Sequence, residues 1–212
     1  MGRDYTIEDW HKAFFAIDRT PEIRKKYMSK FKFNKKSRIL EVGCSDGVNL
    51  EVFQSMGYED VFGTDISIAL LSQVKKSRKR ICTNIYKMGI KDSSFDEIFC
   101  KGLLHHIYTR NMFGELLRIL RPGGVIHICE PWPTLLRKIA DFLTLFVLYP
   151  FSKNVYCRRI VLIFEREMYS YWLRTCKKTL FDQIRKHNLK VIYRHSPLIN
   201  IYLTVQKEGK RR

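Results

Sequence analysis

The chain has 212 residues, of which 45% are hydrophobic, and its 39 Lys and Arg against 21 Asp and Glu give a formal net charge of +18. This length suits one domain, or one domain with an insertion, and the apolar fraction excludes disorder as the default. The charge favours an anionic partner, such as nucleic acid, an anionic lipid surface or a phosphorylated substrate.

Helices and strands are predicted to alternate along most of the chain. Residues 7–31 read as one or two basic amphipathic helices, divided near Pro21, and the polar stretch before them has no signal-peptide core. The alternation after residue 38 predicts βαβ units and a parallel sheet covered on both faces. The strand-like runs are residues 39–42, 61–64, 97–100, 125–129, 191–193 and 199–205, and the helix-like runs are residues 50–56, 68–76, 110–120 and 180–187.

Two segments depart from this pattern. The last two strand-like runs are joined by a short turn at Ser196 and Pro197, so they are expected to pair antiparallel at the sheet edge. Residues 132–178 interrupt the alternation, and their apolar run at 142–151 is too short to span a bilayer. This interruption reads as a helical lid or as an interfacial helix.

The six cysteines form no CxxC pair and no zinc-finger spacing with histidine, so we expect no metal site. Cys44, Cys100 and Cys129 lie in or beside strand-like runs, where they are expected to be small buried hydrophobes. This usage favours a reducing, cytoplasmic location, with a peripheral place at a membrane as an additional possibility. The basic run at residues 75–80 is read as a solvated helix end.

The stretch ILEVGCSDGVNL, residues 39–50, ends a strand-like run in a glycine-bearing turn. Ligands of open α/β sheets bind at the carboxyl ends of the strands, and Gly43 and Gly47 let the backbone approach such a ligand. The turn lacks the GxGxxG pattern that a pyrophosphate needs. Asp65 ends the next strand-like run and is placed to accept hydrogen bonds from ribose hydroxyls. A nucleoside ligand without a dinucleotide pyrophosphate is therefore indicated.

Four motifs in register resemble the class I S-adenosylmethionine-dependent methyltransferases, in their small-molecule branch: ILEVGCSDG, FGTDIS, KDSSFDEIFCKGLLHHI and LRPGGVIHICEPWP. The resemblance implies a single methyltransferase domain over residues 1–212 and S-adenosylmethionine as the cofactor. It implies a Rossmann-like three-layer α/β sandwich whose seven-stranded sheet is mostly parallel, with the last strand antiparallel. An N-terminal helical cap at 1–36 and a helical insertion at 132–178, before strand six, complete the expected fold.

The resemblance also assigns the cofactor-binding residues. One group surrounds the methionine part of the cofactor, a second holds the ribose and the adenine, and a third ends strand four beside the sulfonium. Two departures are Ser45, where the family often has Gly, and Asn84, where it often has Asp. The three groups are Glu41, Gly43, Cys44 and Gly47; Asp65, Ile66, Asn84 and Ile85; and Lys101 with Gly102.

Acceptor-side residues follow strands four and five. His105 or His106 is expected to remove the acceptor's proton, with packing against the lid as the alternative. Glu130 is expected to contact the acceptor, or else to be a solvated loop carboxylate. Tyr169 and Trp172 are candidates for an acceptor pocket, although aromatic residues at helical spacing are more often core.

The sequence thus predicts direct methyl displacement onto a small-molecule, lipid-linked or glycan-linked acceptor. An RNA methyltransferase is the first alternative, because of the charge, although KGLLHH stands where amino-methylating nucleic-acid enzymes carry an NPPY-like motif. A non-catalytic cofactor-binding or interaction module is the second. Basic patches are expected to meet either an anionic membrane surface or RNA.

Overall fold

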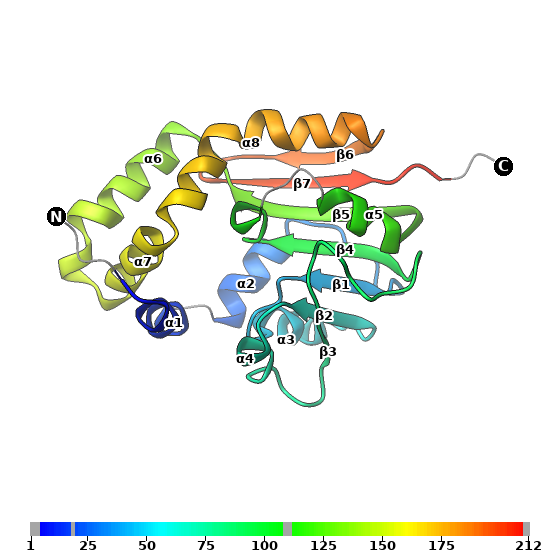
Figure 1. Ribbon diagram of the computed structural model, residues 1–212, viewed down its shortest axis with the longest axis horizontal. Coiled ribbons are helices and arrows are strands. Elements are labelled where there is room, and N and C mark those ends of the chain that lie inside the picture. The colour runs from blue at the N-terminus through cyan, green and yellow to red at the C-terminus, as the bar shows by residue number, and fades with distance from the viewer. Residues whose placement is uncertain (1–4, 18–19, 108–111, 210–212) are drawn as a thin grey trace.

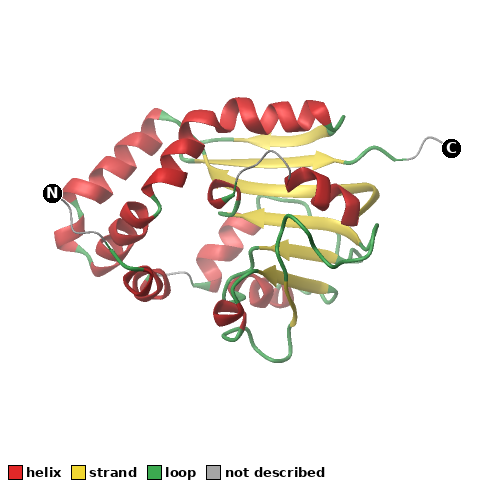
Figure 2. Cartoon of the chain, in the orientation of Figure 1, coloured by secondary structure: helices red, strands yellow, loops and turns green. Residues whose placement is uncertain are grey.

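The computed structural model describes residues 5–17, 20–107 and 112–209. Seven strands form one sheet in the order β3-β2-β1-β4-β5-β7-β6, with helices on both sides (Figure 1, Figure 2). The elements are α1 (Ile7–Ala16), α2 (Pro21–Met28), β1 (Ile39–Val42), α3 (Val48–Ser55), β2 (Val61–Asp65), α4 (Ile68–Leu71), β3 (Lys79–Cys82), β4 (Phe95–Lys101), η1 (Leu104–His106), α5 (Met112–Ile119), β5 (Leu120–Pro131), α6 (Leu135–Phe142), η2 (Leu143–Val147), η3 (Tyr149–Phe151), α7 (Lys153–Phe164), α8 (Arg166–Lys186), β6 (Lys190–His195) and β7 (Asn200–Gln206).

The strand directions confirm the predicted Rossmann-like sheet. β1 pairs in parallel with β2 and β4, and the parallel ladder continues to β3 on one side and β5 on the other. β7 is antiparallel to both β5 and β6, which places the last strand between its two neighbours. The short turn between the last two strands leads to this hairpin, as predicted.

Alternating side chains of the strands feed two cores. Ile98 and Cys100 of β4 belong to the core under α5 and α8, whereas Phe99 between them belongs to the core under α2 and α3. This alternation is the period of two that strand geometry imposes, and it makes a three-layer molecule.

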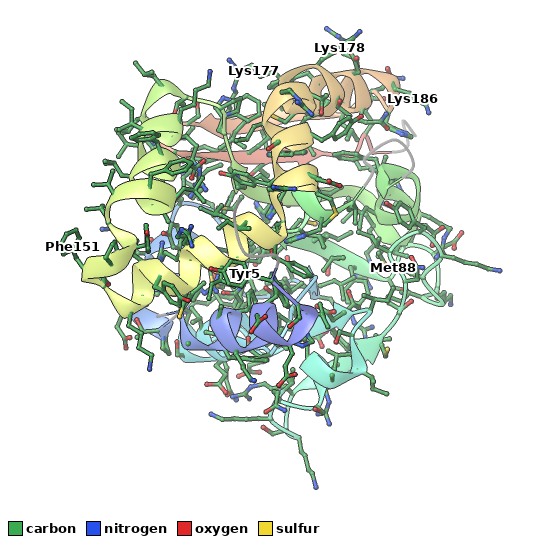
Figure 3. The ribbon with its side chains drawn as sticks, turned by 60° about the vertical axis from the view of Figure 1, so that its left-hand side comes forward. Tyr5, Met88, Phe151, Lys177, Lys178 and Lys186 are labelled. Carbon is green, nitrogen blue, oxygen red and sulfur yellow. The ribbon has the colours of Figure 1, made fainter. Side chains whose placement is uncertain are left out.

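The N-terminal helix and the insertion lie beyond one end of the sheet. α1 lies against α7, through Ala13 on one side and Cys157 and Ile160 on the other. Figure 3 shows Tyr5 between these two helices, where its hydroxyl accepts a hydrogen bond of 3.1 Å from Nη1 of Arg159. Of the expected N-terminal cap, α1 therefore packs on the insertion, whereas α2 packs on the sheet core.

Three expected element boundaries are wrong. Lys79 and Arg80, read as a solvated helix end, belong to the edge strand β3, where one row of side chains stays in solvent and so tolerates charge. α4 stops at Leu71 rather than continuing to residue 76. The helix expected to begin at residue 180 is the last third of α8, so the insertion continues into the core helix without the break expected at 178.

Candidate functional site

The turn after β1 is shaped by positive backbone angles. Gly43, Ser45 and Gly47 have φ of 74°, 53° and 80°. The φ of Gly43 favours glycine, and a Cβ there would lie 2.8 Å from Cδ1 of Leu103, so the Leu103 side chain would also have to shift. The N–H groups of Gly43 and Cys44 both donate to the carbonyl of Thr64, at 2.8 Å each, which fixes the turn against β2.

Asp65 ties the first two strand ends together. Its Oδ2 accepts from the N–H of Ser45 and its Oδ1 from the N–H of Ser67, both at 2.9 Å. Each carboxylate oxygen carries two lone pairs, so both oxygens keep acceptor capacity for a second donor. Two vicinal hydroxyls match this remaining capacity.

A cavity of about 840 Å³ opens at these strand ends. Its walls come from the turns after β1, β2 and β4 and its roof from α1 and α7, with Ile66 contributing an apolar side chain that is 69% exposed. The predicted residues brought together on its wall are Gly43, Cys44, Asp65, Ile66, Asn84, Ile85, Lys101, Gly102, His105 and His106.

Two of the predicted charged groups lie deep beside the turn. Glu41 is 1% exposed beneath the turn, where its Oε1 accepts a hydrogen bond from Nδ2 of Asn49 and burial raises its pKa to about 8. Burial lowers the pKa of Lys101 to about 8, and its Nζ lies 5.1 Å from the ring centre of Tyr27. Both side chains therefore exchange protons near neutral pH, where an incoming charged group shifts them.

His105 is held by a buried carboxylate. Glu130 is 0% exposed; its Oε2 lies 2.8 Å from Nδ1 of His105, and its Oε1 accepts from the N–H groups of Leu103 and Leu104 at 2.7 and 2.8 Å. An ionised carboxylate only accepts, so Nδ1 is the donor in this contact, and in the neutral form of the ring Nε2 then carries the lone pair. Glu130 is thus behind His105 rather than on the cavity wall, which corrects the expectation that it contacts the acceptor or solvent.

Glu165, which the sequence did not single out, completes this cluster. Its two oxygens lie 3.9 Å from Nε2 of His105 and 3.8 Å from Nε2 of His106, and Nε1 of Trp10 donates to it at 2.8 Å. Burial raises the pKa of Glu165, and burial is also the main cause that lowers the pKa of His106 to about 3. His106 is therefore neutral at pH 7.

The donor atoms of His105, His106 and Glu165 all lie within 4.8 Å of one another, so this cluster is spaced to hold either a shared proton or a metal ion. The Cys and His spacing in the sequence gave no sign of it, because Glu165 comes from the far side of the insertion. The sequence signal that could have found Glu165 is its place directly after the apolar end of α7, because a carboxylate that is buried there needs a polar partner.

Tyr169 and Trp172 join the insertion to the sheet and lie off the cavity wall. Nε1 of Trp172 donates to the carbonyl of Pro131 at 2.8 Å, and the Tyr169 ring centre is 5.9 Å from that of His105. Both side chains are buried, 7% and 3% exposed, so the structure supports core packing over an acceptor pocket.

The residues present fit a polar nucleoside cofactor. Ser45 Oγ and Asn49 Oδ1 are buried at the cavity without a hydrogen-bond partner among the described residues. Buried polar atoms of this kind are costly unless a ligand or water satisfies them. With Asp65 on one side and Ile66 on the other, the wall offers partners for hydroxyls, an amino-acid end and a flat apolar ring.

Comparison with known proteins gives matches in the same region. Residues 40–128 match a family model described as a methyltransferase domain. The chain is 30% identical over 101 residues to an uncharacterised protein of Methanocaldococcus jannaschii, covering 48% of this chain and 44% of that protein. It is 24% identical over 107 residues to a rice 24-methylenesterol C-methyltransferase 2, covering 46% and 29%. It is 29% identical over 139 residues to a tRNA U34 carboxymethyltransferase of Campylobacter curvus, covering 58% and 46%.

The fold extends the likeness to the whole chain. A solved putative S-adenosyl-L-methionine-dependent methyltransferase of Methanococcus maripaludis superimposes with a TM-score of 0.63 at 14% identity, covering 100% of this chain and 99% of that one. The chain spans less than half the length of each curated relative named above. The sequence matches thus concentrate on the cofactor half of the fold.

Proposed function

We propose that the chain, whose residues 40–128 match a methyltransferase domain and whose fold is that of S-adenosylmethionine-dependent methyltransferases, methylates a small-molecule, lipid-linked or glycan-linked acceptor whose reacting group must lose a proton. The observation that carries this proposal is the continuity of one cavity. The same wall runs from Asp65 and the glycine turn to the lone pair on His105.

The cofactor-side residues bind the cofactor and orient its methyl group. S-adenosylmethionine, when bound, supplies an electrophilic methyl group and leaves as S-adenosylhomocysteine. Asp65 accepts hydrogen bonds from the ribose hydroxyls, Ile66 covers a face of the adenine, and Asn84 with Ile85 borders its edge. Gly43, Cys44 and Gly47 keep the backbone close to the methionine part, with Glu41, Lys101 and Gly102 around the charged end.

The acceptor-side residues position the acceptor and remove its proton. Glu130 fixes the ring of His105 and its tautomer, so that Nε2 accepts the acceptor's proton. Glu165 stabilises the imidazolium that results, and Trp10 keeps Glu165 in place. Orientation of the two reactants supplies much of the remaining acceleration.

The test uses methyl-labelled S-adenosylmethionine with a membrane lipid extract, a glycan extract and total tRNA as separate acceptor pools. We expect label in the lipid or glycan pool, and loss of that label in His105→Gln with the affinity for S-adenosylhomocysteine kept. His195→Gln, an exposed histidine on β6, is the matched control and is expected to transfer normally. Transfer by His105→Gln at the wild-type rate contradicts the assignment of the base.

Two observations favour RNA as the second candidate: the net charge of +18 and the tRNA-directed relative. Several phosphate contacts would make RNA affinity fall steeply with salt. Label in the tRNA pool together with such a slope would replace the lipid or glycan acceptor. A third outcome, transfer that stops on chelation and returns with a divalent cation, would assign the His105, His106 and Glu165 cluster to a metal instead of a proton.

A further inference from the structure

The insertion carries a continuous apolar surface that nothing in the described chain covers. Phe142, Phe146 and Phe151 are 56%, 66% and 84% exposed, and Figure 3 shows Phe151 projecting from the far end of the lid. Exposed apolar surface on this scale marks an interaction site. We name it the apolar lid face: Leu135, Leu136, Ile139, Phe142, Phe146, Val147, Leu148 and Phe151.

The rotation of α6 is fixed from its inner side. Nε of Arg137 donates to the hydroxyl of Tyr169 at 2.6 Å, and that hydroxyl donates to Asp141 at 2.8 Å. At 3.6 residues per turn, Arg137 and Asp141 lie on the same face of α6, which faces α8. Leu135, Ile139 and Phe142 then lie on the opposite face. The apolar lid face is therefore held outward by a partly buried hydrogen-bond network between α6 and α8.

The charge around this face has one sign. Lys138 is exposed and lies one helical turn from both Leu135 and Phe142, and Lys153 and Arg158 are exposed on α7. Asp141, the acidic residue of this segment, is already paired with Arg137. Between residues 135 and 164 the basic side chains are Arg137, Lys138, Lys153, Arg158 and Arg159.

We propose that the apolar lid face docks onto an anionic phospholipid bilayer, lying in the plane of the interface. Apolar side chains interleaved with basic ones are what such a surface binds, through apolar burial and charge attraction together. Within the described residues no helix has the length and hydropathy to cross a bilayer. A second copy of the chain, with the same charge of +18, is a poorer match than an anionic membrane.

Docking would bring the active cavity to the membrane surface. Val161 of α7 and Glu165 at the α7–α8 junction line the cavity, and the second half of the apolar lid face lies on η2 and η3, which pack against α7. The insertion thus joins the two surfaces in one body. This step rests on the proposed function: the acceptor is then a headgroup or lipid-linked group presented at the bilayer.

The test is sedimentation of the full chain with phosphatidylcholine vesicles, with and without phosphatidylglycerol. We expect binding to the anionic vesicles only, decreasing as salt is raised. In the double variant Phe142→Ser, Phe151→Ser, partitioning falls at least about tenfold for each phenylalanine that enters the bilayer, about 1.4 kcal/mol each. The matched control is Val191→Ser, Ile192→Ser, which removes apolar side chains 41% and 48% exposed on the edge strand β6 and is expected to bind as the wild type does.

Three results would overturn the docking: no binding to anionic vesicles, equal binding by the double variant, or self-association that the double variant abolishes without vesicle binding. S-adenosylhomocysteine affinity, measured on the same variants, is expected to stay unchanged because neither phenylalanine lines the cavity. Vesicle binding without any methyl transfer would keep the docking surface and reject the proposed function, so the two are tested apart.

Discussion

Replacing Glu130 by Gln tests whether Glu130 determines the tautomer of the candidate base, His105. The carboxylate accepts three hydrogen bonds, two from the N–H groups of Leu103 and Leu104 and one from Nδ1 of His105. An amide offers one oxygen, which serves the two backbone donors because that orientation breaks one bond rather than two. The amide NH₂ then faces Nδ1, which must become an acceptor, and the proton moves to Nε2.

The size of the effect follows from this geometry. Hydrogen bonds to a charged, fully buried carboxylate are exchanged for weaker hydrogen bonds to a neutral amide, which costs about 1.5–3 kcal/mol in all. For a chain of this length each kcal/mol lowers Tm by about 2–4 °C, so the expected decrease is about 3–12 °C. With its lone pair removed from Nε2, His105 no longer accepts a proton from the cavity, and transfer falls by about 10²–10⁴-fold.

Nitrogen-15 NMR of the histidine rings reads the tautomer, and thermal denaturation reads the stability. Glu165→Gln is the control, because its oxygen lies 3.9 Å from Nε2 and leaves the bond to Nδ1 intact. The reasoning is refuted if His105 keeps its Nδ1 proton in Glu130→Gln, or if the Tm of that variant equals the Tm of the wild type.

Three further changes test the cofactor side. Asp65→Ala is expected to weaken S-adenosylhomocysteine binding by about 1.5–3 kcal/mol in calorimetry, whereas Asp60→Ala, at the other end of β2, should leave it unchanged. Gly43→Ala should destabilise the fold by about 1–2 kcal/mol in urea denaturation, since its φ is 74°; a silent change would show that the turn relaxes freely. Because the pKa of Glu41 is raised to about 8 in the folded chain, its contribution to the free energy of unfolding is fully present below about pH 4.5 and is lost as the pH rises through about 8. Glu41→Gln should flatten this pH dependence of the unfolding free energy. An unchanged profile would assign the dependence to another group.

The strand core and the glycine turn at the cavity could be read from the sequence, because they depend on local pattern. ILEVGCSDG places a glycine turn at a strand end, and the structure puts Gly43, Asp65 and His105 on one cavity wall. β3 was not predicted as a strand because it lies at the edge of the sheet and begins with two charged residues, Lys79 and Arg80. Edge strands keep one side in solvent and lose the apolar signature.

The acceptor half depends on contacts between distant segments. Trp10, His105 and Glu165 meet only when α1 and the insertion close over the sheet, and no periodicity encodes that meeting. Glu130 shows the same limit. Its position at the end of β5 fits a cavity residue, yet two backbone N–H groups and a ring nitrogen consume its oxygens.

The central claim, that the cavity at the strand ends binds S-adenosylmethionine, is tested most directly by isothermal titration of the purified chain with S-adenosylmethionine and S-adenosylhomocysteine. We predict saturable binding of both, in the micromolar range typical of enzyme substrates and cofactors, roughly −8 kcal/mol. No heat from either ligand at millimolar concentration would contradict the account and leave a Rossmann-like fold that acts as an interaction module.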